Sequence, residues 1–151
     1  MESNPDALLG VRVLDLSRVL AGPFCTMLLA DMGAEVIKLE IPGRGDDSRQ
    51  FPPFKDGESL YYVNLNRGKR SITLNLKHEE GRRIFIELVK QSDVLIENFR
   101  PGTMDRLGVG YEALKEVNPR LVFASSPASD RRGPTGPALG TTSSARRWGG
   151  S

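Results

Sequence analysis

The sequence predicts an α/β domain with a mostly parallel sheet and helices on both of its faces. Short runs with the apolar–polar alternation of strands are separated by longer segments whose apolar residues recur at helical spacing. The first strand, helix and strand together take about 30 residues, the length that a parallel crossover connection needs. Glycine and proline stand between these segments, where helices are expected to begin and end.

The first crossover unit has the clearest pattern. Residues 11–16 (VRVLDL) alternate and are rich in valine and leucine, as a strand should be. Pro23 suits the first turn of a helix, because the N–H that proline lacks has no helical partner there. Apolar residues then recur at helical spacing over 24–32, and Gly33 stands where a C-terminal glycine is expected. Residues 35–39 (EVIKL) complete the unit as a second strand.

The alternation of strands and helices continues to about residue 125. A loop rich in glycine and proline covers 42–58. Residues 79–90 carry an apolar stripe with charges on the opposite face, which is typical of a surface helix. The pattern predicts further strands over 71–76, 93–98 and 121–124, and a short helix over 111–117.

Length and composition narrow the class of protein. A chain of 151 residues has the size of one ordinary domain. It has no apolar run near the roughly 18 residues of a membrane span, and its first residues lack the pattern of a secretion signal. Cys25 and His78, the single cysteine and histidine, allow no disulfide within the chain and make no metal site. We therefore expect a cytoplasmic or organelle-matrix protein with neither a metal nor a membrane partner.

Charge is unevenly distributed along the chain. Residues 1–124 hold 17 Lys and Arg against 18 Asp and Glu, whereas the last 27 residues hold four arginines and one aspartate. The net charge of +2 therefore comes from the C-terminal segment. The balanced body lacks the basic face of a nucleic-acid-binding protein, so we expect no nucleic-acid partner.

Ligands of parallel α/β sheets bind beyond the carboxyl ends of the strands. The segments 17–23, 40–47 and 98–106 are therefore the candidates for a site. The first lacks the glycine-rich pattern of a dinucleotide fold or a P-loop, so nothing directly supports those two kinds of site.

Two clusters of polar residues could carry chemistry. Asn98, Phe99, Arg100 and Arg106 combine an amide, a flat ring and two guanidinium groups, which suits a ligand with an aromatic base and phosphates. The basic run 66–71 (NRGKRS) could also meet phosphates. The competing interpretation of both clusters is a solvated polar turn.

Three single residues carry weaker signals. The strand carboxylate Asp15 has no role that the sequence defines. His78 precedes a glutamate-rich helix start and is expected on the surface. Cys25 lies in an apolar helix, where a packed thiol is the expected state.

Five segments, taken in order, resemble CoA-transferase family III, the CaiB/BaiF family. They are GVRVLDLSRVLAGPF (10–24), DMGAEVIKLEIPGRGDDSR (31–49), NRGKRSITLNLK (66–77), SDVLIENFRPGTMDRLGVGYE (92–112) and NPRLVFAS (118–125). Because several long motifs agree in register over 10–125, the resemblance is specific.

The resemblance implies a Rossmann-like domain that binds CoA, in an enzyme that moves CoA from an acyl-CoA to a carboxylic acid. Members of the family form homodimers of two interlocked subunits. Family members often have arginine at the position of Ile41, so the chain departs from the pattern there. Carried onto this sequence, the CoA contacts fall at Leu20, Ala21, Leu74, Asn75, Leu76, Lys77, Asn98, Phe99, Arg100 and Arg106.

The resemblance also implies an aspartate nucleophile, which carries CoA as an aspartyl-CoA thioester during transfer. In register that aspartate would lie beyond Ser151, so we assign no catalytic residue and expect this chain to be inactive alone. The implied division is a flexible N-terminus (1–9), a CoA-binding domain (10–125) and a disordered tail (126–151). Two alternatives stay open: a fragment of an isomerase like the α-methylacyl-CoA racemases, and a non-catalytic CoA-binding remnant.

The tail leads to a prediction about the gene. After the position of Ser125, family members continue with a stretch like Ile-Ser-Gly-Phe-Gly-Gln-Thr-Gly-Pro-Tyr. Codons can be chosen for that stretch which, read one base out of frame, encode the residues from Ser126 to Pro134, and codons for the same shift can be chosen up to Ser151. If the next family residue is methionine, its codon supplies a stop in the shifted frame after Ser151. We predict that sequencing the coding DNA will show a family-like segment in the neighbouring frame. A neighbouring frame without that segment would contradict the prediction.

Overall fold

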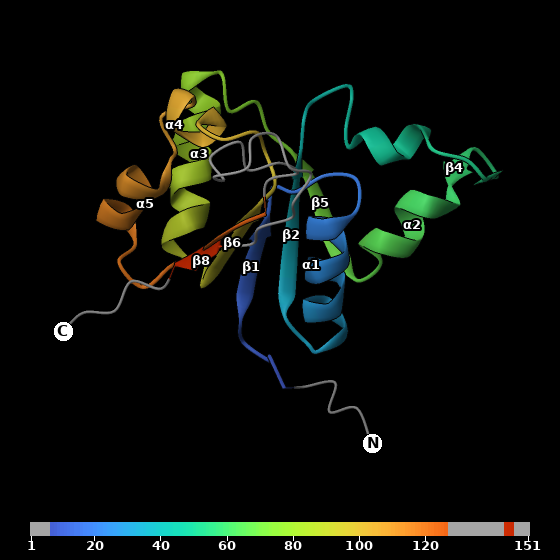
Figure 1. The fold of residues 1–151 in the computed structure, drawn as a ribbon, viewed down its shortest axis with the longest axis horizontal. Coiled ribbons are helices and arrows are strands. Elements are labelled where there is room, and N and C mark those ends of the chain that lie inside the picture. The colour runs from blue at the N-terminus through green and yellow to red at the C-terminus, as the bar shows by residue number, and fades with distance from the viewer. Residues whose placement is uncertain (1–6, 127–143, 147–151) are drawn as a thin grey trace, which may run out of the picture.

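The computed structural model describes residues 7–126 and 144–146 of the chain (Figure 1). Among these residues, the larger sheet has the strand order β5-β2-β1-β6-β7-β8. Its first five members run parallel, and β8 runs antiparallel to β7. The strands are β1 Arg12–Asp15, β2 Glu35–Glu40, β5 Lys69–Thr73, β6 Val94–Glu97, β7 Val122–Ser125 and β8 Ser144–Arg146.

Helices cover both faces of the sheet, which confirms the expected α/β class (Figure 1). One face carries α1 and α2, which contact each other, and the other carries α3 and α5, which also form a contacting pair. A 3-10 turn (η1) and a small hairpin (β3 and β4) lie in the connection between β2 and α2. The remaining bounds are α1 Ala21–Asp31, η1 Asp47–Gln50, β3 Phe54–Lys55, β4 Glu58–Ser59, α2 Leu60–Asn66, α3 Glu79–Lys90, α4 Thr103–Arg106 and α5 Tyr111–Val117.

The strand order creates a switch point between β1 and β6. The chain leaves β1 for a helix on one face and returns beside it as β2, whereas β6 is followed by helices on the other face. The connections on either side of this point therefore diverge and leave a crevice at the carboxyl ends of β1 and β6. Ligands of doubly wound folds bind in such crevices.

Two hydrophobic clusters hold the layers together. Leu14, Leu95 and Phe85, all 0% exposed, join β1 and β6 to α3 on one face. Val13 and Ala34 belong to the cluster on the α1 side. Because neighbouring strand residues point to opposite faces, Val13 and Leu14 serve different clusters. Full burial of side chains of this size stabilises a fold by about 1.5–3 kcal/mol each.

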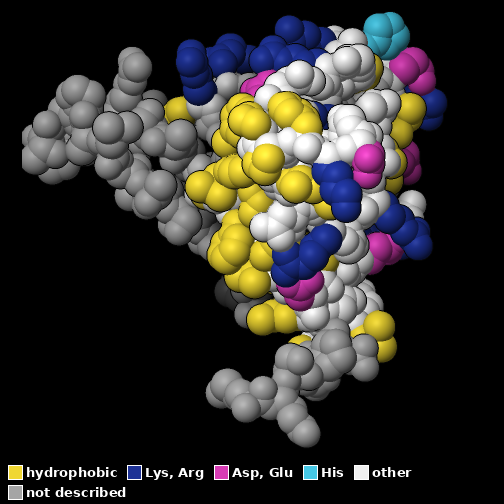
Figure 2. All heavy atoms as spheres, turned by 90° about the vertical axis from the view of Figure 1, so that its right-hand side faces the viewer, with side chains coloured by type: hydrophobic (Ala, Val, Ile, Leu, Met, Phe, Trp, Pro, Cys, Tyr) yellow, Lys and Arg dark blue, Asp and Glu magenta, His cyan; other side chains and the backbone are white. Residues whose placement is uncertain are grey.

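The outer surface of the α1 side is strongly apolar. Figure 2 shows hydrophobic side chains gathered on the face that α1 and α2 present. Leu20, Phe24, Leu28 and Met32 recur every four residues along α1 and its two ends, which places them on one stripe of the helix. Each of the four is between 42% and 53% exposed, so the stripe is unpartnered in a single chain.

The segment 42–58, expected to be an irregular loop, contains η1 and the β3–β4 hairpin, and α2 follows it. The apolar periodicity of the sequence did not predict the helix α2. Ser59 caps this helix by accepting a hydrogen bond from the backbone N–H of Tyr62 at 3.1 Å. The short helix α4 was missed as well, because four residues are too few to show a period.

The strand expected at 71–76 is shifted toward the N-terminus. It is β5, Lys69–Thr73, and its pairing ends where Thr73 meets Glu40, the last residue of β2. The N–H of Leu74 still donates to the carbonyl of Glu40 at 3.0 Å, after which the chain leaves the sheet. Residues 74–77 therefore extend past the carboxyl edge, although their apolar–polar alternation continues.

Both ends of the chain lie largely outside the described residues. Within the expected flexible N-terminus, Leu8 is tied down, because its N–H donates to the Met32 carbonyl at 2.9 Å. Within the tail expected to be disordered, Ser144–Arg146 pairs with β7 as β8, and the rest of 127–151 lies outside the described residues. Across the described residues, no helix has the length and apolarity of a membrane span.

Candidate functional site

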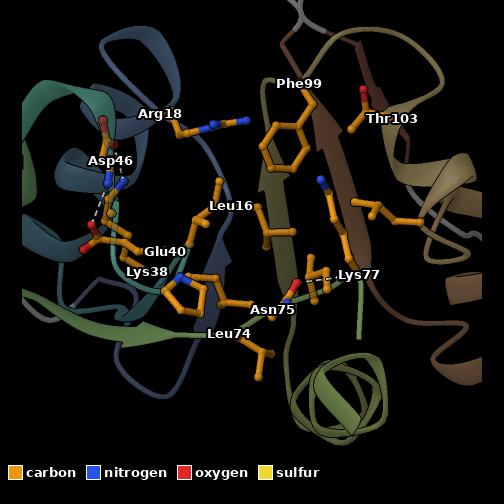
Figure 3. Close-up of a pocket in the computed structure, with 16 residues that line it drawn as sticks. Leu16, Arg18, Lys38, Glu40, Asp46, Leu74, Asn75, Lys77, Phe99 and Thr103 are labelled. Carbon is orange, nitrogen blue, oxygen red and sulfur yellow. Dashed lines mark hydrogen bonds and ion pairs between the residues drawn. The ribbon is translucent and has the colours of Figure 1, made fainter. Parts of the chain in front are cut away.

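A cavity of about 510 Å³ opens at the carboxyl edge of the sheet, at the switch point (Figure 3). Its walls come from four places: the end of β1 and the loop after it, the end of β2 with residues 41–46, residues 74–77, and the segment from Phe99 to Leu107. Segments of the chain more than 80 residues apart thus share one cavity. The apolar residues that line it are Leu16, Leu39, Ile41, Pro42, Leu74, Leu76, Phe99 and Leu107.

A buried ion pair forms part of the cavity wall. Lys38 on β2 is 1% exposed, and its Nζ lies 2.8 Å from Oδ2 of Asp46, whose side chain is 0% exposed. The same Nζ donates to the carbonyl oxygen of Ser17 at 2.9 Å. Burial by itself would raise the pKa of Asp46, but the charge and hydrogen bond of Lys38 outweigh burial and hold that pKa below its ordinary value.

Glu40, the last residue of β2, is the acceptor in a network of donors. Arg49 approaches it with two nitrogens, each 2.8 Å from a carboxylate oxygen. The hydroxyls of Tyr62 and Ser71 donate to Oε1 at 2.7 and 2.6 Å. Burial opposes ionisation, but the hydrogen bonds from Arg49 and its neighbours outweigh it and hold the pKa of Glu40 well below its ordinary value. Glu40 is therefore an ionised anchor for the loop that follows β2.

A second buried pair explains the basic run 66–71. Nζ of Lys69 lies 3.0 Å from Oδ2 of Asp15, and both side chains are almost fully buried. Burial lowers the pKa of Lys69, and the attraction of Asp15 offsets part of that shift. Arg67 points elsewhere and pairs with Asp31 at 2.5 Å. Lys69 is therefore committed to Asp15 inside the fold, whereas Arg67 and Arg70 lie exposed at the surface and pair with Asp31 and Glu35.

Arg18 and Phe99 meet across the switch point. The guanidinium carbon of Arg18 lies 4.9 Å from the centre of the Phe99 ring, and both side chains line the cavity (Figure 3). A cation above an aromatic face is attracted to the electrons of the ring. The contact leaves the N–H donors of the guanidinium available to a ligand.

The charges around the cavity do not cancel. Among its charged lining residues, Lys38 is paired with Asp46, and Glu40 is paired with Arg49. Arg18 and Lys77 also line the cavity, and neither forms an ion pair with any residue in 7–126. The cavity therefore combines two unpaired cations with an apolar wall and an aromatic ring, which suits a flat, anionic ligand.

Comparison with known proteins identifies the family. The model of CoA-transferase family III matches residues 8–150. The chain belongs to CoA-transferase family III.

Two relatives of the chain carry the names of CoA-transferases that act on different acids. The chain is 55% identical to an acetyl-CoA:oxalate CoA-transferase of Acetobacter aceti over 125 residues, covering 83% of this chain and 32% of the relative. It is 48% identical to the succinyl-CoA:glutarate CoA-transferase of Homo sapiens, covering 87% of this chain and 30% of the relative. The chain thus spans about a third of the length of these relatives.

A solved structure shares both the fold and the sequence. A CaiB/BaiF family protein from Brucella suis superimposes with a TM-score of 0.77 at 44% identity. The match covers 84% of this chain and 35% of that structure. The likeness confirms the Rossmann-like architecture that the resemblance implied.

The structure brings half of the CoA contacts expected for the family into the cavity wall. Leu74, Asn75, Leu76, Lys77 and Phe99 all line it. The first four do so because β5 ends at Thr73, which lets the following residues turn across the carboxyl edge.

The other expected contacts lie outside the cavity wall. Leu20 and Ala21 are exposed at the start of α1, and Arg100 is exposed after β6. A nitrogen of Arg106 donates to the hydroxyl of Thr103 at 3.0 Å. Asn98 uses its side-chain amide to hold the backbone of Arg18.

Sequence reasoning did not single out several residues of the cavity. Arg18, Glu40 and Asp46 fall within candidate segments 17–23 and 40–47, but nothing local distinguishes them from solvated charges. Lys38 interrupts the apolar pattern of a central strand, and this interruption was the available signal. A lysine in such a strand requires a buried partner.

The remaining polar candidates lie away from the cavity wall. His78 is exposed and caps α3, since its Nδ1 accepts from the N–H of Glu80 at 3.3 Å. Cys25, expected to be packed, is exposed on α1. Among the residues that the structure describes, no group of three His, Cys, Asp or Glu could hold a metal ion.

The Glu40 network predicts a dependence of stability on pH. Because the folded protein holds the pKa of Glu40 below the ordinary 4.5, its stabilisation is complete above that pH and is lost as the pH falls below it. The free energy of unfolding should therefore fall more steeply with acidification in the wild type than in Glu40→Gln. The steepest contribution of one such group is about 1.4 kcal/mol per pH unit.

Urea denaturation between about pH 5 and pH 3 measures this slope. Arg49→Gln, which removes the two nitrogen contacts of the guanidinium, should reduce the slope but keep some of it, because the other donors to Glu40 remain. Equal slopes in the wild type and Glu40→Gln would show that Glu40 is not an ionised anchor.

Proposed function

We propose that this chain binds CoA in the cavity at the switch point, as the CoA-binding portion of a CoA-transferase. The observation that carries the proposal is the pair of unpaired cations, Arg18 and Lys77, beside the Phe99 ring and the apolar segment after β5. CoA supplies the matching chemistry, since it has a flat adenine ring and several phosphates. Membership of the family supports the same ligand.

The proposed pose places the adenine against Leu74, Leu76 and Phe99, with the phosphates toward Lys77 and the rim of the cavity. Asn75 offers its backbone and side chain at the same wall, although its Oδ1 already accepts from the N–H of Lys77 at 3.0 Å. Of the expected contacts outside the wall, Arg100 and Arg106 are exposed, and we propose that they meet phosphates that project from the cavity, as Leu20 and Ala21 do at the start of α1. The side chain of Asn98 instead bonds the backbone of Arg18.

The proposed reaction of the complete enzyme moves CoA between two acids. An aspartate attacks the thioester carbonyl, the CoA thiolate leaves, and a mixed anhydride forms. The thiolate then attacks the aspartyl carbonyl, which releases the first carboxylic acid and leaves an aspartyl-CoA thioester. The acceptor carboxylate attacks this thioester to form a second anhydride and expel the thiolate. Attack of the thiolate on the acceptor carbonyl gives the new acyl-CoA and restores the aspartate.

Neither carboxylate in the cavity wall suits the role of that nucleophile. Asp46 is locked to Lys38, and both oxygens of Glu40 accept hydrogen bonds from buried donors. We therefore propose that the covalent aspartate is not among the described residues, and that this chain binds CoA without transferring it.

The apolar stripe on α1 supports the proposal of an assembled enzyme. A soluble chain gains little by exposing Phe24, Leu28 and Met32 on one stripe, and larger patches of this kind mark contact surfaces. We propose that the complete enzyme is a homodimer, as the family resemblance implies, with this face covered.

Two alternatives lead to different chemistry. An isomerase related to the α-methylacyl-CoA racemases would exchange the α-proton of an acyl-CoA with solvent. A CoA-binding remnant would bind but leave the thioester unchanged. The relatives compared above carry the names of CoA-transferases, which favours the transferase.

Titration calorimetry with CoA tests the binding. We expect the wild-type chain to bind, and Phe99→Ala and Lys77→Gln to weaken binding about tenfold or more, because each removes a contact to the base or to a charge. Lys115→Gln removes the same charge from an exposed position on α5 and should leave the affinity unchanged. Absence of heat in the wild type, with a folded spectrum, would overturn the proposal.

A second measurement addresses turnover. Incubation of the chain with an acyl-CoA and an isotopically labelled acid should give no labelled acyl-CoA, because the aspartate of the cavity wall, Asp46, is paired with Lys38. The same reaction in heavy water should show no exchange at the α-carbon. Label in the acyl-CoA would show that the chain carries its own nucleophile, and α-exchange would favour the isomerase.

A further inference from the structure

We propose that Arg18 is an anion-binding residue of the cavity and that Asn98 is the positioning residue that presents it. This inference rests on the proposed CoA site and adds to it. It assigns a phosphate contact to a residue outside the expected set and gives Asn98 a role other than direct contact with the ligand.

Both polar atoms of the Asn98 side chain bond a single residue. Its Oδ1 accepts from the N–H of Arg18 at 2.8 Å, and its Nδ2 donates to the carbonyl oxygen of Arg18 at 2.7 Å. Two antiparallel hydrogen bonds of this kind fix the backbone of Arg18 in both position and orientation. Asn98 does not belong to the cavity wall, so its amide faces the loop after β1 and not the ligand.

The loop that Asn98 holds needs such support. Val19, the residue after Arg18, has a φ of +71°, a region that a β-branched residue rarely adopts. A backbone strained by about 1–3 kcal/mol persists only when its surroundings enforce it. The N–H of Val19 donates to Asp46 Oδ1 at 3.2 Å, so one anchor comes from the β2 side and the other from Asn98 on the β6 side.

The conformation of this loop determines where the guanidinium lies. Arg18 extends from the loop toward the Phe99 ring, which follows Asn98 directly in the sequence (Figure 3). The backbone that carries the ring is itself held, since the N–H of Phe99 donates to Oε2 of Glu97 at 2.7 Å. Consecutive residues 98 and 99 thus hold the backbone and the side chain of Arg18 respectively.

Charge supplies the reason to expect an anion at Arg18. The guanidinium makes no ion pair within residues 7–126, while the nearby Lys38 and Asp46 neutralise each other. A guanidinium binds a phosphate through two parallel N–H donors, and a ring behind it keeps its plane fixed. A phosphate of CoA is the anion that the proposed ligand brings to this side of the cavity.

The test combines a double-mutant cycle with a spectroscopic probe. The proteins are the full chain with Arg18→Gln, with Asn98→Ala, with both changes, and with Arg120→Gln as an exposed control. We expect each single change to weaken CoA binding about tenfold, the double change to weaken it no further than either alone, and the control to bind like the wild type. Asn98→Ser, which also loses the two bonds, serves if Asn98→Ala does not fold.

The Nε–Hε NMR signal of Arg18 reports on position as well as binding. It should shift on addition of CoA or inorganic pyrophosphate to the wild type. In Asn98→Ala it should move to an exposed-arginine position before any ligand is added, while the amide signals of the core stay in place. A purely structural Asn98 would alter the core signals and the melting temperature instead.

The outcomes separate the two proposals. A wild type that does not bind CoA but shifts the Arg18 signal with pyrophosphate would overturn the CoA site and keep the role of Arg18. A wild type that binds CoA with unchanged affinity in Arg18→Gln would overturn this inference and keep the CoA site. Additive losses in the double variant would show that Asn98 acts independently of Arg18.

Discussion

The cavity depends most on the buried pair of Lys38 and Asp46. Nζ of Lys38 binds Oδ2 of Asp46 at 2.8 Å and the carbonyl of Ser17 at 2.9 Å, while Oδ1 of Asp46 accepts from Val19 at 3.2 Å and from Ser48. One ion pair therefore connects β2 to the loops after β1 and β2. Removal of one partner from such a pair leaves a buried charge and typically costs about 3–5 kcal/mol.

The charges at the carboxyl edge define positions more than they add stability. Glu40 with Arg49 and Lys69 with Asp15 repeat the arrangement of Lys38, a buried charge whose partner comes from another element. The free energy lost when two charges leave water offsets most of the attraction between them. Well-packed apolar residues in the same place often stabilise a fold as much as such an ion pair does. Directional hydrogen bonds, however, set the relative placement of the loops after β1 and β2, which apolar contacts would leave loose. The proposed binding of a ligand between these loops makes that placement functional.

Local sequence patterns predicted the strands and helices whose periodicity is visible within a short segment of the chain. The strand at 35–39 and the helix at 79–90 show their period within ten or twelve residues, and both lie where the pattern put them. The role of Asn98 has no such signature, because its partner Arg18 is 80 residues away. Residues 74–77 show the opposite case, since they continue the strand pattern while the neighbouring strand has already ended at Glu40. Their place in the cavity was implied by the family resemblance and not by periodicity.

The two unpaired cations prepare one side of the cavity for an anion. Arg18 and Lys77 enter the cavity from different elements, and without an anion their like charges repel across a partly apolar space (Figure 3). The Phe99 ring attracts the guanidinium of Arg18, and the bonds from Asn98 hold the backbone from which that side chain extends. A phosphate between them would replace repulsion by two attractions without moving the backbone. In the proposed site, the loop after β1 is held by these bonds without a ligand, so the binding energy of an anion need not be spent on ordering it.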